Sequence, residues 1–133
     1  FAAGSLEEGD MVRDKPSLLG GLYREIEEEF GLLSAHFKSV NPYVVFSLET
    51  ERHPNFNYDI HLKSDSSDIK KIFERKLLEL QKVGLKPELG SIHFIDNNAS
   101  SIKRELEKDH GRYRPSVAVL LDYMVAEMEN GRR

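Results

Sequence analysis

The 133-residue sequence contains no cysteine, which excludes disulfide bonds and thiolate metal sites. It contains no apolar run long enough to cross a membrane and no signal-peptide pattern, so we expect a cytoplasmic protein without a membrane partner. No run of Lys and Arg is longer than two residues, and the formal net charge is -4. This balance does not favour a nucleic-acid groove.

The composition is that of one globular domain. With 39% hydrophobic and 32% charged residues, the chain has enough apolar material for a single core, and we expect one domain over residues 1–133. The chain begins at Phe1, and its opening letters, FAAGSLEEGD, are typical of an apolar strand end followed by an acidic, glycine-bearing loop. We therefore expect further strands to precede Phe1 in the native protein.

Apolar spacing and turn residues predict both helices and strands. Helices are expected over residues 17–33, 66–84, 100–111 and 114–131, and strands over 42–50, 56–62 and 91–95. The first two strands are separated by the turn-like RHPN, which predicts a hairpin. The mixture indicates an α/β or α+β fold in which helices pack on a mixed sheet.

The first helix carries four acids in five positions: Glu25, Glu27, Glu28 and Glu29. On a helical wheel with Glu25 at zero, the apolar stripe is centred near roughly 80° and Glu29 falls near roughly 40°. Glu28 falls near roughly 300°, and Glu27 points to another side. Three carboxylates therefore line one border of the apolar face, and Glu29 is turned partly inward.

Such a border is electrostatically unfavourable without a cation. Two unit charges about 4 Å apart interact by roughly 4 kcal/mol at an effective dielectric constant near 20. Arg24 neutralises only part of the charge, whereas a divalent cation such as Mg²⁺ would make the whole arrangement attractive. The alternative is a solvated acidic helix face, which is what a run of Glu usually forms.

The stretch GSLEEGDMVRDKPSLLGGLYREIEEEFGL, residues 4–32, resembles the signature of the Nudix hydrolases. That signature is Gly, five residues, Glu, seven residues, Arg-Glu, an aliphatic residue, any residue, Glu-Glu, any residue, Gly and an aliphatic residue. Gly4 takes the first position, and the second half, from Arg24 to Leu32, matches at every defined position.

The first half of the signature departs from the family pattern in two ways. Asp10 stands where the family has Glu, and thirteen residues (11–23) instead of seven separate it from Arg24. The six extra residues are MVRDKP (11–16). Because these residues end in Pro16, directly before the candidate N-cap Ser17, we expect the insertion to lie before the helix and to leave its register intact.

The resemblance implies a Nudix-like α/β/α sandwich that hydrolyses a pyrophosphate linkage in a nucleoside diphosphate derivative, with Mg²⁺ or Mn²⁺ as cofactor. The partner would be a nucleotide-type small-molecule substrate. Glu28 and Glu29 would be metal ligands, and Glu25 a ligand or the base that activates water. Arg24 would orient the glutamates, and the backbone carbonyl of Ala3 would be a further ligand.

Two features outside the signature bear on the site. The family often places another acid on a late loop, and Glu88 occupies such a place, with a solvated loop acid as the alternative. The helix at 66–84 is long for this family and would cover the substrate, form an interface such as that of a homodimer, or simply bury one face. The alternative functions are a catalytically inactive Nudix-like domain that binds a nucleotide or a protein, and an unrelated helix–sheet domain with an acidic surface.

Overall fold

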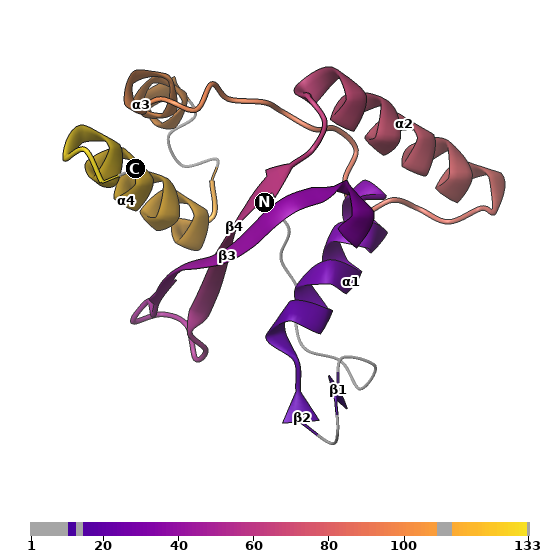
Figure 1. Ribbon diagram of the computed structural model, residues 1–133, viewed down its shortest axis with the longest axis horizontal. Helices are drawn as coiled ribbons and strands as arrows, with labels where there is room; N and C mark the ends of the chain where they lie inside the picture. Colours follow the sequence, from indigo (N-terminus) through magenta and orange to yellow (C-terminus); the bar gives the residue numbers. More distant parts are fainter. Residues whose placement is uncertain (1–10, 13–14, 109–112, 133) are drawn as a thin grey trace. The chain divides into compact units, whose positions relative to one another are not determined.

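The computed structural model describes residues 11–12, 15–108 and 113–132 (Figure 1). The chain forms two compact units: one comprises Phe1–Tyr43 and Tyr58–Ile92, the other Val44–Asn57 and His93–Arg133. The expectation of one domain over the whole chain stays a prediction. Among the described residues, every helix is too short or too polar to cross a lipid bilayer.

Helix α1 (Leu18–Phe30) begins and ends at the expected signals. The Ser17 hydroxyl accepts a hydrogen bond from the Gly20 N–H at 3.0 Å and so satisfies one of the free donors of the first turn. Gly31 adopts φ 75°, the left-handed conformation that glycine tolerates best, and its N–H donates to the Glu27 carbonyl at 2.9 Å. The predicted helix is confirmed, although it ends at Phe30 and not at Leu33.

The inserted residues form a small ladder before this helix. Strands β1 (Met11–Val12) and β2 (Lys15–Pro16) pair antiparallel, with Met11 opposite Pro16. The ladder ends directly before the N-cap of α1. The described residues of the segment 11–16 thus precede the helix, as predicted, and the unchanged register relative to the family stays a prediction.

A hairpin follows α1 after the short 3₁₀ turn η2 (Ser34–His36). Its strands, β3 (Phe37–Phe46) and β4 (Asn55–Leu62), form a two-stranded sheet. The hairpin is confirmed, but β3 begins five residues earlier than the predicted strand (42–50), because Phe37 is buried in the core next to α1. Lys63 N–H donates to the His36 carbonyl at 3.0 Å and closes the base of the hairpin.

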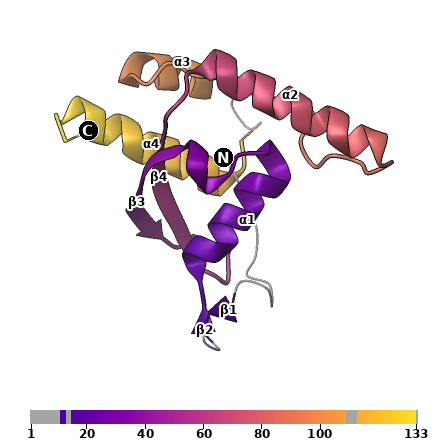
Figure 2. The ribbon, with the colours of Figure 1, turned by 45° about the vertical axis from the view of Figure 1, so that its right-hand side comes forward.

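Helix α2 (Ser66–Lys82) completes the first unit. Its N-cap is Asp65, whose carboxylate accepts a hydrogen bond from the Asp68 N–H at 2.9 Å. Figure 2 shows α2 next to the C-terminal end of α1, where the rings of Phe30 and Phe73 lie 6.1 Å apart.

The core of the first unit gathers the apolar stripes of α1 and α2 with the base of the hairpin. Its buried members are Ile26, Leu32, Phe37 and Ile69. Phe73 is the most completely buried large side chain among the described residues, at 2% exposure. α1 is thus held from both its hairpin side and its α2 side, which fixes the direction in which its acidic border points.

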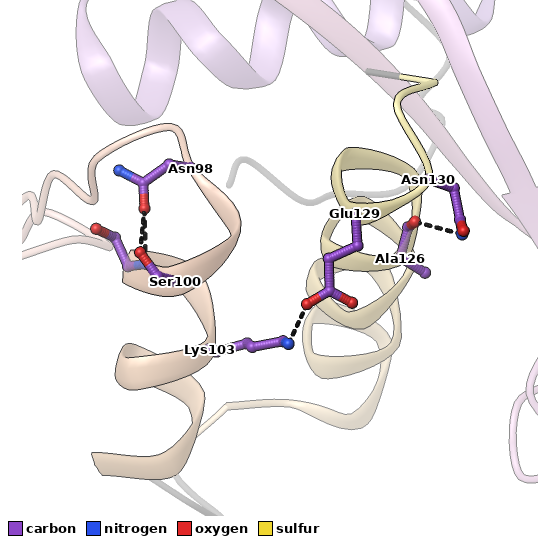
Figure 3. A network of polar contacts seen from close by, with 7 residues as sticks. Asn98, Ser100, Lys103, Ala126, Glu129 and Asn130 are labelled. Atoms are coloured by element: carbon purple, nitrogen blue, oxygen red, sulfur yellow. Dashed lines mark hydrogen bonds and ion pairs between the residues drawn. The ribbon is translucent and has the colours of Figure 1, made fainter.

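The second unit is built on two helices, α3 (Ala99–Lys108) and α4 (Pro115–Glu129). Ile102, Leu121 and Val125 form its buried core. Figure 3 shows the polar edge of this pair, where Lys103 of α3 and Glu129 of α4 form an ion pair. The Asn98 side chain accepts hydrogen bonds from the Ser100 hydroxyl and the Ser101 N–H and thereby caps the N-terminus of α3.

One predicted strand is wrong. Residues 91–95 form no strand and belong to the connector between α2 and α3. Their apolar side chains serve two different cores, because Ile92 packs against the first cluster and Ile95 against the second. The described residues combine helices with two small two-stranded sheets, so the α+β class is confirmed and the sandwich on a mixed sheet stays a prediction.

Candidate functional site

The acidic border of α1 contains positions with very different access to solvent. Glu29 is 9% exposed, and the Glu25 side chain is 14% exposed. The Glu28 side chain is 58% exposed, and Glu27 is exposed as well. The inward turn of Glu29 expected from the helical wheel is confirmed, because the residue lies at the edge of the stripe that contains Ile26.

Three carboxylates come together in the first unit. Glu25 and Glu29 lie one turn apart on α1, and Glu88 comes from the connector that follows α2. One oxygen from each residue lies within 4.8 Å of the others. In Figure 1 this connector turns back from α2 toward the C-terminal end of α1. The cluster therefore joins two segments that lie far apart in the sequence.

Glu29 carries the most perturbed carboxyl of the cluster. Burial, followed by the charges of Glu25 and Glu88, raises the pKa of Glu29 from 4.5 to about 7, and a hydrogen bond with Glu25 acts in the same direction. Its Oε2 is buried and has no hydrogen-bond partner among the residues that the structure describes. A buried carboxylate oxygen without a partner is costly unless a proton or a cation joins it.

Arg24 holds the outer side of the border. Its Nη1 lies 2.7 Å from Glu25 Oε1 and 3.3 Å from Glu28 Oε2. The shorter contact is a charge-assisted hydrogen bond that restrains the Glu25 carboxylate. These contacts are those that an orienting role of Arg24 would require. Glu29 instead lies next to Glu25 and Glu88.

The donor set fits a hard divalent cation. Mg²⁺ and Ca²⁺ prefer oxygen ligands, and the cluster offers carboxylate oxygens from three residues. Two oxygens on one Mg²⁺ are about 3 Å apart when adjacent and about 4 Å apart when opposite, given bond lengths near 2.1 Å. Oxygens within 4.8 Å of one another need only small side-chain adjustments to reach that spacing. Glu29 Oε2, which has no hydrogen-bond partner among the described residues, would gain such a partner from a bound cation.

The structure separates the expected ligands into three groups. It brings together Glu25, Glu29 and Glu88, whereas Glu28 faces outward beside Arg24 and does not belong to the cluster. Ala3, whose carbonyl was an expected ligand, lies outside the described residues, as do the other signature positions before the helix up to residue 10. The helical wheel already put Glu28 farthest from the apolar stripe, but no local sequence signal placed Glu88 against α1.

A second polar cluster, in the second unit, was missed by the sequence analysis. Glu105 Oε1 accepts a hydrogen bond from the Tyr113 hydroxyl at 3.1 Å and lies 3.2 Å from His93 Nε2. Because this carboxylate joins α3 to the segments on either side of it, its evident role is to hold the second unit together. Its three residues share no sequence spacing that would have marked them.

Comparisons of the chain with protein-family models, with curated proteins and with solved structures found no match. The functional argument therefore rests on the residues and geometry of the cluster.

Proposed function

We propose that the protein is a divalent-cation-dependent hydrolase that cleaves a pyrophosphate linkage in a nucleoside diphosphate derivative. The observation that carries this proposal is the buried oxygen of Glu29, which has no partner among the described residues and lies in a cluster of three carboxylates. Two of the three come from the helix whose residues match the second half of the Nudix signature. The Nudix-like α/β/α sandwich is part of the same proposal.

Glu25, Glu29 and Glu88 are the residues we assign to the cation. Mg²⁺ or Mn²⁺ there would supply the positive charge that phosphoryl transfer needs at the phosphate oxygens and would favour ionisation of a water molecule. Arg24 keeps Glu25 fixed through the 2.7 Å contact, so that the second Glu25 oxygen faces the reacting groups or accepts a proton from water. Burial of Glu29 keeps bulk water away from one side of the site and strengthens every charge interaction in it.

Glu28 is the residue on which the family resemblance and the geometry lead to different assignments. The resemblance makes it a ligand, but its exposed side chain lies with Arg24 and outside the cluster. If the cluster is the cation site, Glu28→Gln will reduce Mg²⁺ affinity less than Glu88→Gln does. Titration calorimetry measures both affinities. A larger loss of Mg²⁺ affinity in Glu28→Gln than in Glu88→Gln would show that Glu28 is a ligand.

The test of the function is turnover. The protein is incubated with Mg²⁺ or Mn²⁺ and a panel of nucleoside triphosphates, ADP-ribose, dinucleoside polyphosphates and capped RNA, and nucleotide products are separated by chromatography. We expect hydrolysis of at least one compound, a strong loss in Glu29→Gln, and little change in Glu27→Gln, an exposed acid on the same helix.

The alternatives give different results in the same experiment. A domain that only binds nucleotides would retain ligand without forming products. An acidic surface of an unrelated fold would show no specific Mg²⁺ binding, and Glu29→Gln and Glu27→Gln would behave alike. Either result would refute the hydrolase.

A further inference from the structure

Among the residues that the structure describes, backbone hydrogen bonds hold the connector between α2 and α3 at its two ends. At its start, the N–H groups of Gly84 and Leu85 donate to carbonyls of the last turn of α2, at 3.1 and 2.9 Å. At its end, the N–H of Ile102 in α3 donates to the Asn98 carbonyl at 3.2 Å. Between them, residues 86–95 make no backbone hydrogen bond with any other residue that the structure describes.

The contacts of the middle of the connector with the described part of the chain are made by side chains. Ile92 packs against the core of the first unit, and the side chains of Pro87 and Leu89 are half-buried. Glu88 stands between those two residues, and its carboxylate reaches Glu25 and Glu29 on α1. The polar contact of this segment with α1 is thus made by a carboxylate that faces two other carboxylates.

Whether the three carboxylates repel or attract the connector depends on whether a cation lies between them. Without a counter-charge the carboxylates repel, and the repulsion is strengthened by the low dielectric around buried Glu29. The buried Glu29 Oε2 without a described partner provides an independent indication that a ligand belongs there. A divalent cation makes the contact between connector and helix attractive.

We propose that a divalent cation is a clasp between the connector and α1: binding to Glu25, Glu29 and Glu88 holds residues 86–92 on the helix, and removal of the cation releases them. The clasp uses the cation site of the proposed function, but it does not require hydrolysis. It makes the position of the connector, and with it access to the site, dependent on cation concentration.

The absence of cysteine makes the clasp measurable, because two introduced cysteines would be the only ones in the chain. Ser91 and Glu27 are both exposed, the first on the connector and the second on α1 away from the cluster. Spin labels on Ser91→Cys and Glu27→Cys report the distance between the two segments by double electron–electron resonance. Mg²⁺ is the probe, because it is diamagnetic, and EDTA removes it.

We expect a broad distance distribution in EDTA and a single narrow one with saturating Mg²⁺. Adding Glu88→Gln should keep the distribution broad and weaken Mg²⁺ binding at least about tenfold, the loss that follows even from removing an outer partner of a metal site. Glu79→Gln, at an exposed acid of α2, is the matched control. Its distance distribution should narrow with Mg²⁺ as that of the parent protein does. Circular dichroism verifies that both variants fold.

The outcomes separate the clasp from the enzyme. A distribution that stays unchanged while calorimetry shows Mg²⁺ binding overturns the clasp, and so does a Glu88→Gln protein that still narrows. Turnover without any change in distance refutes the clasp and leaves the hydrolase. Narrowing without turnover on the nucleotide panel supports the clasp and refutes the hydrolase. No Mg²⁺ binding at all overturns both.

Discussion

Replacing Glu29 by Gln should stabilise the metal-free protein at neutral and alkaline pH. Gln is close in size to the protonated acid, and its amide can donate to the Glu25 carboxylate, but it cannot ionise. The pKa values of 4.5 and about 7 correspond to a roughly 300-fold difference in proton affinity, which is worth about 3 kcal/mol. At about pH 8 the metal-free Glu29→Gln protein should therefore be more stable than the parent by up to about 3 kcal/mol.

The pKa of Glu29 also determines the direction in which folding stability changes with pH. The folded protein holds the Glu29 proton up to a pH of about 7, whereas the unfolded chain loses it near 4.5. Between these values the folded state binds more protons, so this residue makes stability fall as pH rises, until the full cost is reached above pH 7. The advantage of Glu29→Gln should thus grow from about 1 kcal/mol at pH 5 to about 3 kcal/mol at pH 8.

Urea denaturation in EDTA at several pH values measures this difference, with Glu27→Gln as the control on the same helix. Mg²⁺ should reverse the order. At about 1,000 times its Kd, the ion stabilises the parent by roughly 4.1 kcal/mol, which exceeds the advantage of Glu29→Gln in EDTA, and Glu29→Gln should gain much less. A Glu29→Gln protein that is less stable in EDTA at pH 8, or whose advantage does not change with pH, would refute the account of Glu29.

Two further predictions concern the packing that holds α1 in place. Gly31 and Gly84 both have φ near +75°, but a Cβ on Gly31 would lie 3.0 Å from Lys76 Cβ, whereas none of the described atoms lies within 4 Å of a Cβ on Gly84. Gly31→Ala should therefore cost more than the roughly 1–2 kcal/mol of backbone strain expected for Gly84→Ala, and equal losses in urea denaturation would show that this contact is unimportant. Phe73→Ala should cost about 3–5 kcal/mol, whereas Leu78→Ala, at a site 57% exposed on the same helix, should stay within about 0.5 kcal/mol; thermal unfolding of both checks this.

Local signals in the sequence predicted the helices well. Ser17 and Gly31 mark the ends of α1 because a hydroxyl N-cap and a left-handed glycine satisfy backbone groups that the helix leaves free. The helical wheel placed Glu29 at the edge of the buried stripe, and its 9% exposure follows from that geometry. These features depend on residues within one or two turns of each other, which a single sequence contains.

Features that depend on distant partners were predicted less well. The letters SIHFI (91–95) have strand composition, but a strand also needs a neighbour to pair with, and Ile92 and Ile95 pack into separate cores instead. Glu88 was chosen by analogy with the family, and nothing in its neighbourhood indicates that it meets α1. The outward position of Glu28 was present in the wheel, but the signature gave it the same role as Glu29.

The acidic run of α1 therefore combines two kinds of glutamate. Glu27 and Glu28 are exposed and fit a solvated face, at little cost to the helix. Glu25 and Glu29 turn toward Glu88, and there burial and the neighbouring carboxylates make ionisation of Glu29 unfavourable. Below pH 7 a proton removes this cost, and above it a cation can, so protons and cations compete for the same oxygens. Apparent Mg²⁺ affinity should consequently rise as pH increases toward 7 and level off above it, a dependence that a merely solvated acidic face would not show.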